Sequence, residues 1–342
     1  MPRALFTFDP AFRAPRGGPI IDLQRGLAQA GDFPLSVDGI FASQTVAAVK
    51  LWQTKAGMTA SGAVDDLSSL GLTHTNKPSL FRRCLALTAA YEGQGYTLAV
   101  GNFDGAGVTW GIIGFTLLTG DLAKVIKLIE ARSPGLLATS FGDNVTELLH
   151  ILDASKADKT IWANSISTGP KKVGLRTDWR DGFETLGNQV AARAAQDELA
   201  HDDYWRIAVR DIGLYGKLTE LDAAIFFDTA VQSGGVNDEK GAAVSASLHT
   251  LPGGAGDRER LRAIAEALTT GVNPAYVGDV RARRMSIAAG MGKVHGATYK
   301  ISNWALDTIE IDDIWVEAIR SGMNHGRLAR RSFAIDHQNE DT

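Results

Sequence analysis

The sequence predicts a mostly α-helical protein that joins a small three-helix domain to a larger α+β domain with a short β-hairpin. The chain has 342 residues, which is enough for two ordinary domains. Apolar residues recur at helical spacing over residues 20–70 and again over residues 80–91. Between residues 96 and 115, aromatic, β-branched and glycine residues replace that periodicity, which is typical of a hairpin.

The composition excludes several classes of protein. Hydrophobic residues make up 44% of the chain and charged residues 22%, which is ordinary globular usage. A formal net charge of -4 gives no basic footprint for nucleic acid and no polybasic anchor for a membrane. The longest apolar stretch, Val108 to Leu118, is far shorter than the roughly 20 residues of a membrane helix. Cys84 is the only cysteine and the seven histidines are scattered singly, so we expect no disulfide, metal or cofactor.

Residues 1–16 are predicted to be an amino-terminal arm. The first twelve residues contain neither the apolar core of a signal peptide nor a small-residue cleavage site. We therefore expect a protein that is made in the cytoplasm without a signal peptide.

Residues 17–73 are predicted to form the three-helix domain. Its first helix carries apolar residues from position 20 onward and stops at Gly31. Ser43 is placed to cap a second helix, which ends at Gly57, and a third amphipathic segment covers residues 64–70.

This domain contains Leu23-Gln24, Leu27, Val37 to Phe41, Thr45, Ala48-Val49, Trp52-Gln53 and Ser61 to Val64. The order of these residues resembles the bacterial peptidoglycan-binding domain of three short helices. Ala42 departs from it by replacing an expected glycine, and the matching residues also fit the core of any three-helix module. If the resemblance extends to binding, it implies that Asp38 and Gln53 contact glycan.

Residues 74–79 form a polar stretch that contains Pro78, and they are predicted to be a linker. The larger domain then covers residues 80–342. Its first helix is capped by Ser79 and ends near Glu92, because Gly93 breaks the apolar pattern.

A second acid follows on the predicted hairpin. Residues 96–103 and 108–115 are expected to be its two strands, with Asp104 in the turn between them. A glycosidase needs one protonated carboxyl that donates to the leaving oxygen and one ionised carboxyl that activates water. A helix-end acid and a hairpin acid form the layout of a lysozyme-like glycosidase, although two acids at this spacing are also common on protein surfaces.

Around the two acids the chain contains Tyr91-Glu92, Asn102 to Thr109, Gly111 to Thr116 and Thr119 to Leu122. The order of these residues resembles the chitosanases of glycoside hydrolase family 46. This resemblance implies that Glu92 is the general acid, that Asp104 is the general base and that Thr109 helps to hold the nucleophilic water. Weaker matches to the same family follow at Ala195 to Asp197, Asp203 to Trp205, Phe226 to Gly235, Arg281 to Arg284 and Gly290 to Tyr299.

We expect Asp121, Tyr96, Asp228 and Gln232 to contact the substrate. For Asp121 the resemblance implies a sugar contact, but a position just before an amphipathic helix fits a turn and N-cap equally well. Asp228 lies among phenylalanines, where an ionised acid is costly unless it is paired. It is expected to form a buried ion pair with Arg281, Arg283 or Arg284, near the floor of the cleft.

Two parts of the sequence depart from the family pattern. The segment between Glu92 and Asp104 is shorter than in typical chitosanases, which places chitosan itself in question as the substrate. Residues 136–178 offer little to align and are expected to form a variable insertion over the cleft. At most one of four tryptophans is expected to stack on sugar: Trp110, Trp179, Trp205 and Trp304.

Taken together, these features predict a peptidoglycan-degrading glycosidase of the lysozyme type, either a phage endolysin or an antibacterial effector. Such an enzyme would reach the wall through a holin or a secretion system. Its expected partners are glycan strands and, for an effector, an immunity protein. A chitosanase with an accessory binding module, a lytic transglycosylase and a non-catalytic wall-binding protein remain alternatives. The bond that is cut and the oligomeric state stay open.

Overall fold

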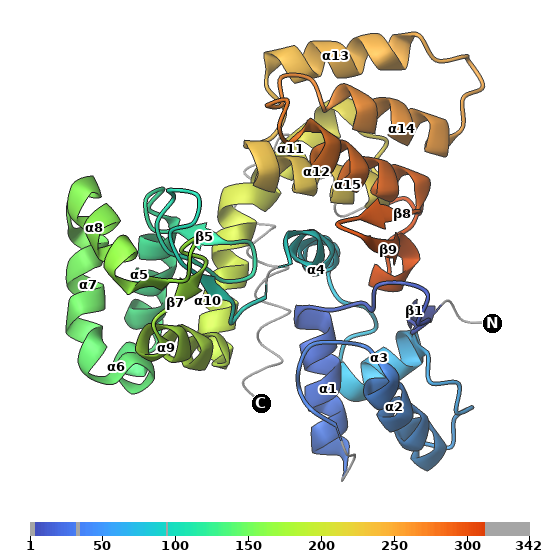
Figure 1. Ribbon diagram of the computed structural model, residues 1–342. Coiled ribbons are helices and arrows are strands. Elements are labelled where there is room, and N and C mark those ends of the chain that lie inside the picture. Colours follow the sequence, from blue (N-terminus) through green and yellow to red (C-terminus); the bar gives the residue numbers. More distant parts are fainter. Residues whose placement is uncertain (1–3, 32–34, 94, 312–342) are drawn as a thin grey trace. The chain divides into compact units, whose positions relative to one another are not determined.

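The computed structural model describes residues 4–31, 35–93 and 95–311 and confirms a mostly α-helical fold with short strands (Figure 1). The chain divides into two compact units. Unit 1 comprises residues 1–91 and 203–342, and unit 2 comprises residues 92–202. Within the described ranges, no helix has both the length and the apolar character needed to cross a bilayer.

The first part of unit 1 contains the three predicted helices. They are α1 (Gly18–Ala30), α2 (Ser43–Lys55) and α3 (Asp66–Thr73). Proline in the first turn of α1 costs no hydrogen bond, because the first amides of a helix have no partner within it. The side chain of Asp65 caps α3 by accepting from the Ser68 amide at 2.8 Å.

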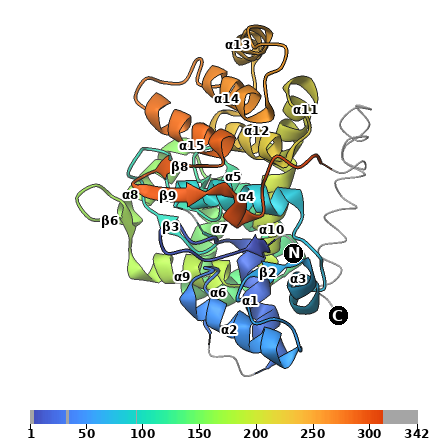
Figure 2. The same cartoon turned by 90° about the vertical axis from the view of Figure 1, so that its right-hand side faces the viewer.

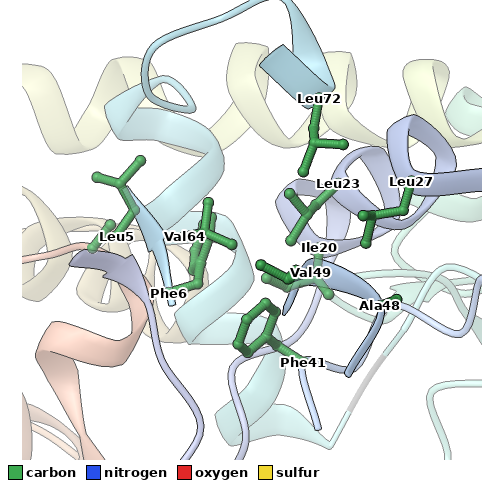
Figure 3. Close-up of a cluster of buried hydrophobic side chains, with 11 residues drawn as sticks. Leu5, Phe6, Ile20, Leu23, Leu27, Phe41, Ala48, Val49, Val64 and Leu72 are labelled. Atoms are coloured by element: carbon green, nitrogen blue, oxygen red, sulfur yellow. The ribbon is translucent and has the colours of Figure 1, made fainter. Parts of the chain in front are cut away.

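A compact apolar cluster forms the core of these helices (Figure 3). It also includes Leu5 and Phe6 of the short strand β1 (Ala4–Phe6), which pairs antiparallel with β2 (Val64–Asp65). These first residues are therefore part of the domain core rather than a separate arm. The other members of the cluster are Ile20, Leu23, Leu27, Phe41, Ala48, Val49, Val64, Leu72 and Ala305.

Two buried glutamines hold the two long loops of this domain in the same way. Gln24 Oε1 accepts from the Gly39 amide at 2.7 Å, and its Nε2 donates to the next carbonyl at 3.2 Å. Gln53 forms the same two bonds with Gly62 at 2.9 Å and with the carbonyl of the following residue at 2.8 Å. Both glycines have positive φ angles, 72° and 75°, which glycine adopts without strain. In both cases, a buried glutamine on a helix thus binds a glycine in the loop that follows that helix.

The predicted linker lies within unit 1. Lys77 Nζ and Arg83 Nη1 both bind Glu220 Oε1, at 2.5 and 2.9 Å. Ser79 Oγ accepts from the Arg82 amide at 3.4 Å, at the start of helix α4. The stretch after the three-helix domain is therefore fixed to a buried helix of the same unit.

The rest of unit 1 is a helical assembly around the buried helix α12 (Glu220–Ser233). The rings of Phe81, Trp205 and Phe227 pack together with centroids 5.7 to 5.8 Å apart. The other elements are α4 (Leu80–Glu92), α11 (Arg206–Tyr215), α13 (Asp238–His249), α14 (Asp257–Ala267), α15 (Val277–Ala289), β8 (Met291–Val294), β9 (Ala297–Lys300) and the 3-10 helix η3 (Ile301–Trp304).

Unit 2 contains a small antiparallel sheet in the order β3-β4-β5 and several helices. The sheet consists of β3 (Ala99–Val100), β4 (Thr109–Trp110) and β5 (Phe115–Thr116). The predicted hairpin therefore exists, but its paired regions are much shorter than expected. The helices are α5 (Asp121–Arg132), α6 (Leu136–Phe141), the 3-10 helix η1 (Gly142–Asn144), α7 (Val145–Asp153), α8 (Lys156–Ile166), α9 (Thr177–Gly187) and α10 (Val190–Ala200), followed by the π-helix η2 (His201–Trp205).

Residues 136–178, expected to be a variable insertion, are an integral part of this unit. They form α6 to α8 and the hairpin of β6 (Ser167–Thr168) and β7 (Gly174–Leu175). Trp162 packs edge-on against Trp179 at 4.9 Å, and Phe141 packs edge-on against Phe183 at 5.0 Å. Because these rings fill the core of unit 2, the segment is structural.

Candidate active site

Asp104 lies in the loop that joins β3 to β4. The residue is exposed, and its Oδ1 accepts from the Ala106 amide at 3.0 Å. Gly105 and Gly107 both have φ angles of 84°, a conformation that residues with a Cβ rarely adopt. The loop sequence therefore folds into a tight turn with the carboxylate on its surface.

The Asn102 side chain closes this loop around Asp104. Its Oδ1 accepts from the Gly107 amide at 2.9 Å, while its Nδ2 donates to Asn164 Oδ1 at 3.0 Å. The backbone amide of Asn102 donates to Ser167 Oγ at 2.9 Å. One bond joins the two ends of the loop and the other two join Asn102 to α8 and β6, so the loop is fixed before any substrate binds.

A close backbone contact explains the glycine at position 101. Its amide donates to Val173 O at 2.8 Å, and a Cβ there would lie 2.4 Å from Lys172 O and 2.6 Å from Gly174 O. A glycine within a strand pattern is the sequence signal of such an approach. The β6–β7 hairpin therefore packs directly on the base of the Asp104 loop.

Thr109 lies in β4, opposite Val100 on one side and Thr116 on the other. Its side chain is largely buried. The strand pairing places Thr109 and Asp104 on one hairpin, as the sequence predicts.

Glu92 is the last residue of α4. The preceding turn is buried, Glu92 itself is partly exposed, and Gly93 follows with a φ of 68°. A glycine in this left-handed conformation is a common end for a helix. The Glu92 carboxyl therefore lies where a buried helix reaches the surface, and it belongs to the same unit as Asp104.

Tyr96 was expected to bind substrate, but it lies inside unit 2. Its ring is 5% exposed and its hydroxyl donates to Asp197 Oδ1 at 2.7 Å. The Arg193 guanidinium lies 5.8 Å from the ring centroid. These contacts favour a structural role, in which Tyr96 anchors the segment between Glu92 and β3 to helix α10.

Gln196 reinforces this anchor and was not singled out as a site residue from the sequence. Its Nε2 donates to Tyr96 O at 3.1 Å, and its Oε1 accepts from the Ile112 amide at 2.8 Å. A Cβ on Gly111 would meet the same oxygen at 2.5 Å. One buried amide thus joins the segment after Glu92 to the β4–β5 turn, and the family resemblance at residues 195–197 is the signal that could have found it.

Asp121 occupies the first turn of α5, and Gly120 is the N-cap. Its carboxylate accepts from Thr119 Oγ1 at 2.9 Å and pairs with Lys124 Nζ at 3.0 Å. A carboxylate at this end of a helix is favoured by the helix dipole. The helix-start interpretation is therefore correct to within one residue, and a sugar contact stays a prediction.

Asp228 forms the buried ion pair that the sequence predicts. Its Oδ1 accepts from Arg283 Nη2 at 2.6 Å and from Arg283 Nε at 3.1 Å, and the side chain is fully buried. Arg284 Nε lies 4.0 Å from Oδ2, whereas Arg281 pairs with Glu266 at the surface. A carboxyl without exposed surface has no access to sugar in this structure, so the predicted substrate contact of Asp228 is not supported. Gln232, in the last turn of α12, is partly exposed.

The aromatic residues also differ from expectation. All four tryptophans considered as sugar platforms are at most 1% exposed and belong to the core: Trp110, Trp179, Trp205 and Trp304. Phe103, directly before Asp104, is 53% exposed instead. Its position in the loop was visible in the sequence, but its exposure depends on the turn geometry.

The two predicted wall contacts of the three-helix domain lie in different environments. Asp38 is exposed, and its Oδ1 accepts from Gln24 Nε2 and from the Ile40 amide, both at 2.8 Å. Gln53 is only 2% exposed, because its amide is bound within the loop described above. Its burial favours a structural role over a glycan contact.

Comparisons with known proteins cover both domains. Residues 88–251 match the model of glycosyl hydrolase family 46, and residues 16–67 match that of a putative peptidoglycan binding domain. A curated chitosanase of Bacillus subtilis (strain 168) is 26% identical over 161 residues, which cover 46% of this chain and 52% of the relative. The chain thus spans about half the length of that relative.

Solved chitosanase structures also match this chain, at lower sequence identity. Native chitosanase from Bacillus subtilis MY002 is 18% identical, with a TM-score of 0.46 over 65% of this chain and 98% of that one. A family 46 chitosanase from Gynuella sunshinyii in complex with chitotetraose is 16% identical, with a TM-score of 0.41 over 71% and 90% of the two chains. From the family models, the chain is similar to a putative peptidoglycan binding domain over residues 16–67 and to glycosyl hydrolase family 46 over residues 88–251.

Proposed function

We propose that this protein hydrolyses β-1,4 bonds in an amino-sugar polymer, with Glu92 as the general acid and Asp104 as the general base. The observation that carries the proposal is the exposed Asp104 on a loop that is closed by Asn102, within the unit that begins at Glu92. The family 46 match from residue 88 to residue 251 includes both acids.

The proposed reaction uses the two carboxyls on opposite faces of the sugar. Glu92 donates its proton to the glycosidic oxygen as the bond to the anomeric carbon breaks. Asp104 accepts a proton from the water whose oxygen forms the new bond to that carbon, and Thr109 helps to orient this water. An inverting reaction of this kind requires carboxyls about 6.5–9.5 Å apart when substrate is bound.

Peptidoglycan is the substrate that we favour, because the same chain carries a domain of the peptidoglycan-binding type. The glycan of the bacterial wall is a β-1,4-linked chain of hexosamines, as is chitosan. In this proposal the three-helix domain holds the enzyme on its polymer while the catalytic domain cuts. The protein would act in the wall as a phage endolysin or, together with an immunity protein, as an antibacterial effector, after release by a holin or a secretion system.

A true chitosanase is the second candidate. It is favoured by the curated relative at 26% identity, which is named a chitosanase. In that case the three-helix domain would serve only as an anchor.

Mass spectrometry of soluble products from purified peptidoglycan and from chitosan, incubated in parallel, tests the proposal. Reducing muropeptides from the wall would support a lysozyme-type hydrolase, and the sugar at the reducing end would identify the bond. Products lighter by one water would indicate a lytic transglycosylase and would contradict the role of Asp104. Chitosan fragments with an intact wall would favour the second candidate. Loss of cleavage of either polymer in Glu92→Gln but not in Asp143→Asn, an exposed acid on η1, would assign the activity to this site.

A further inference from the structure

The β6–β7 hairpin lies beside the Asp104 loop within unit 2. Val173 O accepts from the Gly101 amide at 2.8 Å, so the backbones of the two segments are in contact. Asn164 Oδ1 accepts from Asn102 Nδ2 at 3.0 Å and from Lys172 Nζ at 2.8 Å. Lys172 is therefore one side chain away from the residue that closes the loop. Figure 2 shows the hairpin extending outward from its unit.

The β6–β7 hairpin carries two positive charges, on Lys171 and Lys172. Lys171 and Lys172 are both exposed, and residues 167–175 contain no acid. Among the residues that the structure describes, neither lysine pairs with a carboxylate. Five other cations of unit 2 do form such pairs: Lys124 with Asp121, Lys127 with Asp153, Arg132 with Glu198, Arg176 with Asp178 and Arg180 with Asp181.

Exposed apolar side chains accompany these lysines. Phe103 is 53% exposed and Val173 is 48% exposed, and they belong to the two segments that the Gly101 hydrogen bond joins. An aromatic ring beside the proposed base offers a flat face to a sugar or an acetamido methyl group.

From these contacts we infer that Lys171, Lys172 and Phe103 form a subsite for N-acetylated glycan that carries peptide stems. This inference rests on the proposed function and names the substrate class of that site. The two ammonium groups bind carboxylates of the stem peptides, and Phe103 packs on the uncharged N-acetylated sugar. Chitosan carries an ammonium group on each glucosamine, so the same lysines repel it.

The test separates the charge of the lysines from their contacts in the fold. A double variant, Lys171→Glu with Lys172→Gln, removes the positive charge and keeps an N–H donor for Asn164. The matched control, Lys156→Glu with Lys159→Gln on α8, changes the net charge of the unit by the same amount. Each protein is assayed on intact peptidoglycan, on the same glycan after an amidase has removed the stems, and on chitosan.

We expect the double variant to lose about tenfold in kcat/KM on intact peptidoglycan, mainly through KM, as two surface ion pairs are lost and partly reversed. Cleavage of stem-free glycan should stay within twofold, and any cleavage of chitosan should be unchanged or faster. The loss should shrink as salt is raised, because exposed charges are screened. Phe103→Ala should instead lower turnover of both peptidoglycan substrates.

Equal rates for the double variant and the control on intact peptidoglycan would overturn the subsite and leave the proposed function standing. An equal loss on stem-free glycan would also overturn it, because the lysines would then act on the fold or on the sugar itself. If the unmodified protein cleaves none of the three polymers, the proposed function fails first.

Discussion

Asn102 and Gly107 are joined by a hydrogen bond of 2.9 Å from the Gly107 amide to the Asn102 side-chain carbonyl. This bond spans the turn that presents Asp104, so the geometry of the proposed base depends on a side chain that is not itself an acid. Asn102→Ala leaves the buried Gly107 amide without its acceptor, at a cost of about 1–3 kcal/mol in stability.

We therefore predict that Asn102→Ala lowers kcat by about tenfold to 100-fold while KM changes little, since a misplacement of about 1 Å has effects of that size. Steady-state kinetics on the preferred polymer and a urea titration measure the two effects separately. A variant that is less stable but has the full kcat would show that the Asp104 loop does not need this support.

Amide substitutions test the roles of the two proposed catalytic acids. Glu92→Gln should lower turnover by about 10²- to 10⁴-fold and leave folding and wall binding intact, because it removes only the proton donor. Asp104→Asn should lose most activity as well if water is the nucleophile. Turnover near that of the unmodified protein for Asp104→Asn would instead indicate a single-acid transglycosylase. Product analysis together with a pull-down on insoluble wall measures activity and binding in the same samples.

The buried pair of Asp228 and Arg283 gives a test of stability in unit 1. Asp228→Asn removes the carboxylate charge that faces the buried Arg283 guanidinium, which should lower the free energy of unfolding by about 3–5 kcal/mol. The control is Glu266→Gln, which breaks a pair with Arg281 whose two side chains are about half exposed, and which should change it by less than about 1 kcal/mol. Urea denaturation compares the two, and equal effects would show that Asp228 is not held as the structure describes.

Cys84 should report on opening of helix α4. Burial raises the pKa of its thiol well above the ordinary value, so almost no reactive thiolate forms at pH 8 in the folded protein. We predict that a thiol reagent labels this cysteine very slowly until denaturant is added, when labelling becomes fast and complete. Rapid stoichiometric labelling under native conditions would contradict this packing. Because the chain has one cysteine, the signal has a single source.

Residues that typically begin or end helices made the first helices predictable. Gly31, Ser43 and Gly57 mark their ends in the sequence, and the structure places helix boundaries within two residues of each. The strand at residues 4–6 could not be predicted, because three residues are too few to show an alternating pattern. Its pairing partner also lies far along the chain, at Val64 and Asp65. The burial of Gln53 was missed for a related reason. Glutamine is usually exposed, and only the loop that it closes makes burial favourable.

The proposed acids were predictable because their residue types and spacing follow a known family. The residues that support Asp104 could not be predicted. Asn164 and Ser167 lie about sixty residues beyond Asn102, and no local sequence pattern indicates that they bind Asn102. Tyr96 was interpreted as a sugar contact from its place near the acids. Its hydroxyl instead satisfies Asp197, which no spacing rule could anticipate.

The order in which the ribosome makes this chain has a consequence for its folding. Unit 1 consists of two segments, and the 111 residues of unit 2 are synthesised between them. Phe81 of α4 therefore cannot pack on Trp205 and Phe227 until unit 2 has been translated. Translation of unit 2 takes about 6 to 20 s at ordinary rates of synthesis. During that interval α4 lacks the packing partners that the second segment of unit 1 supplies.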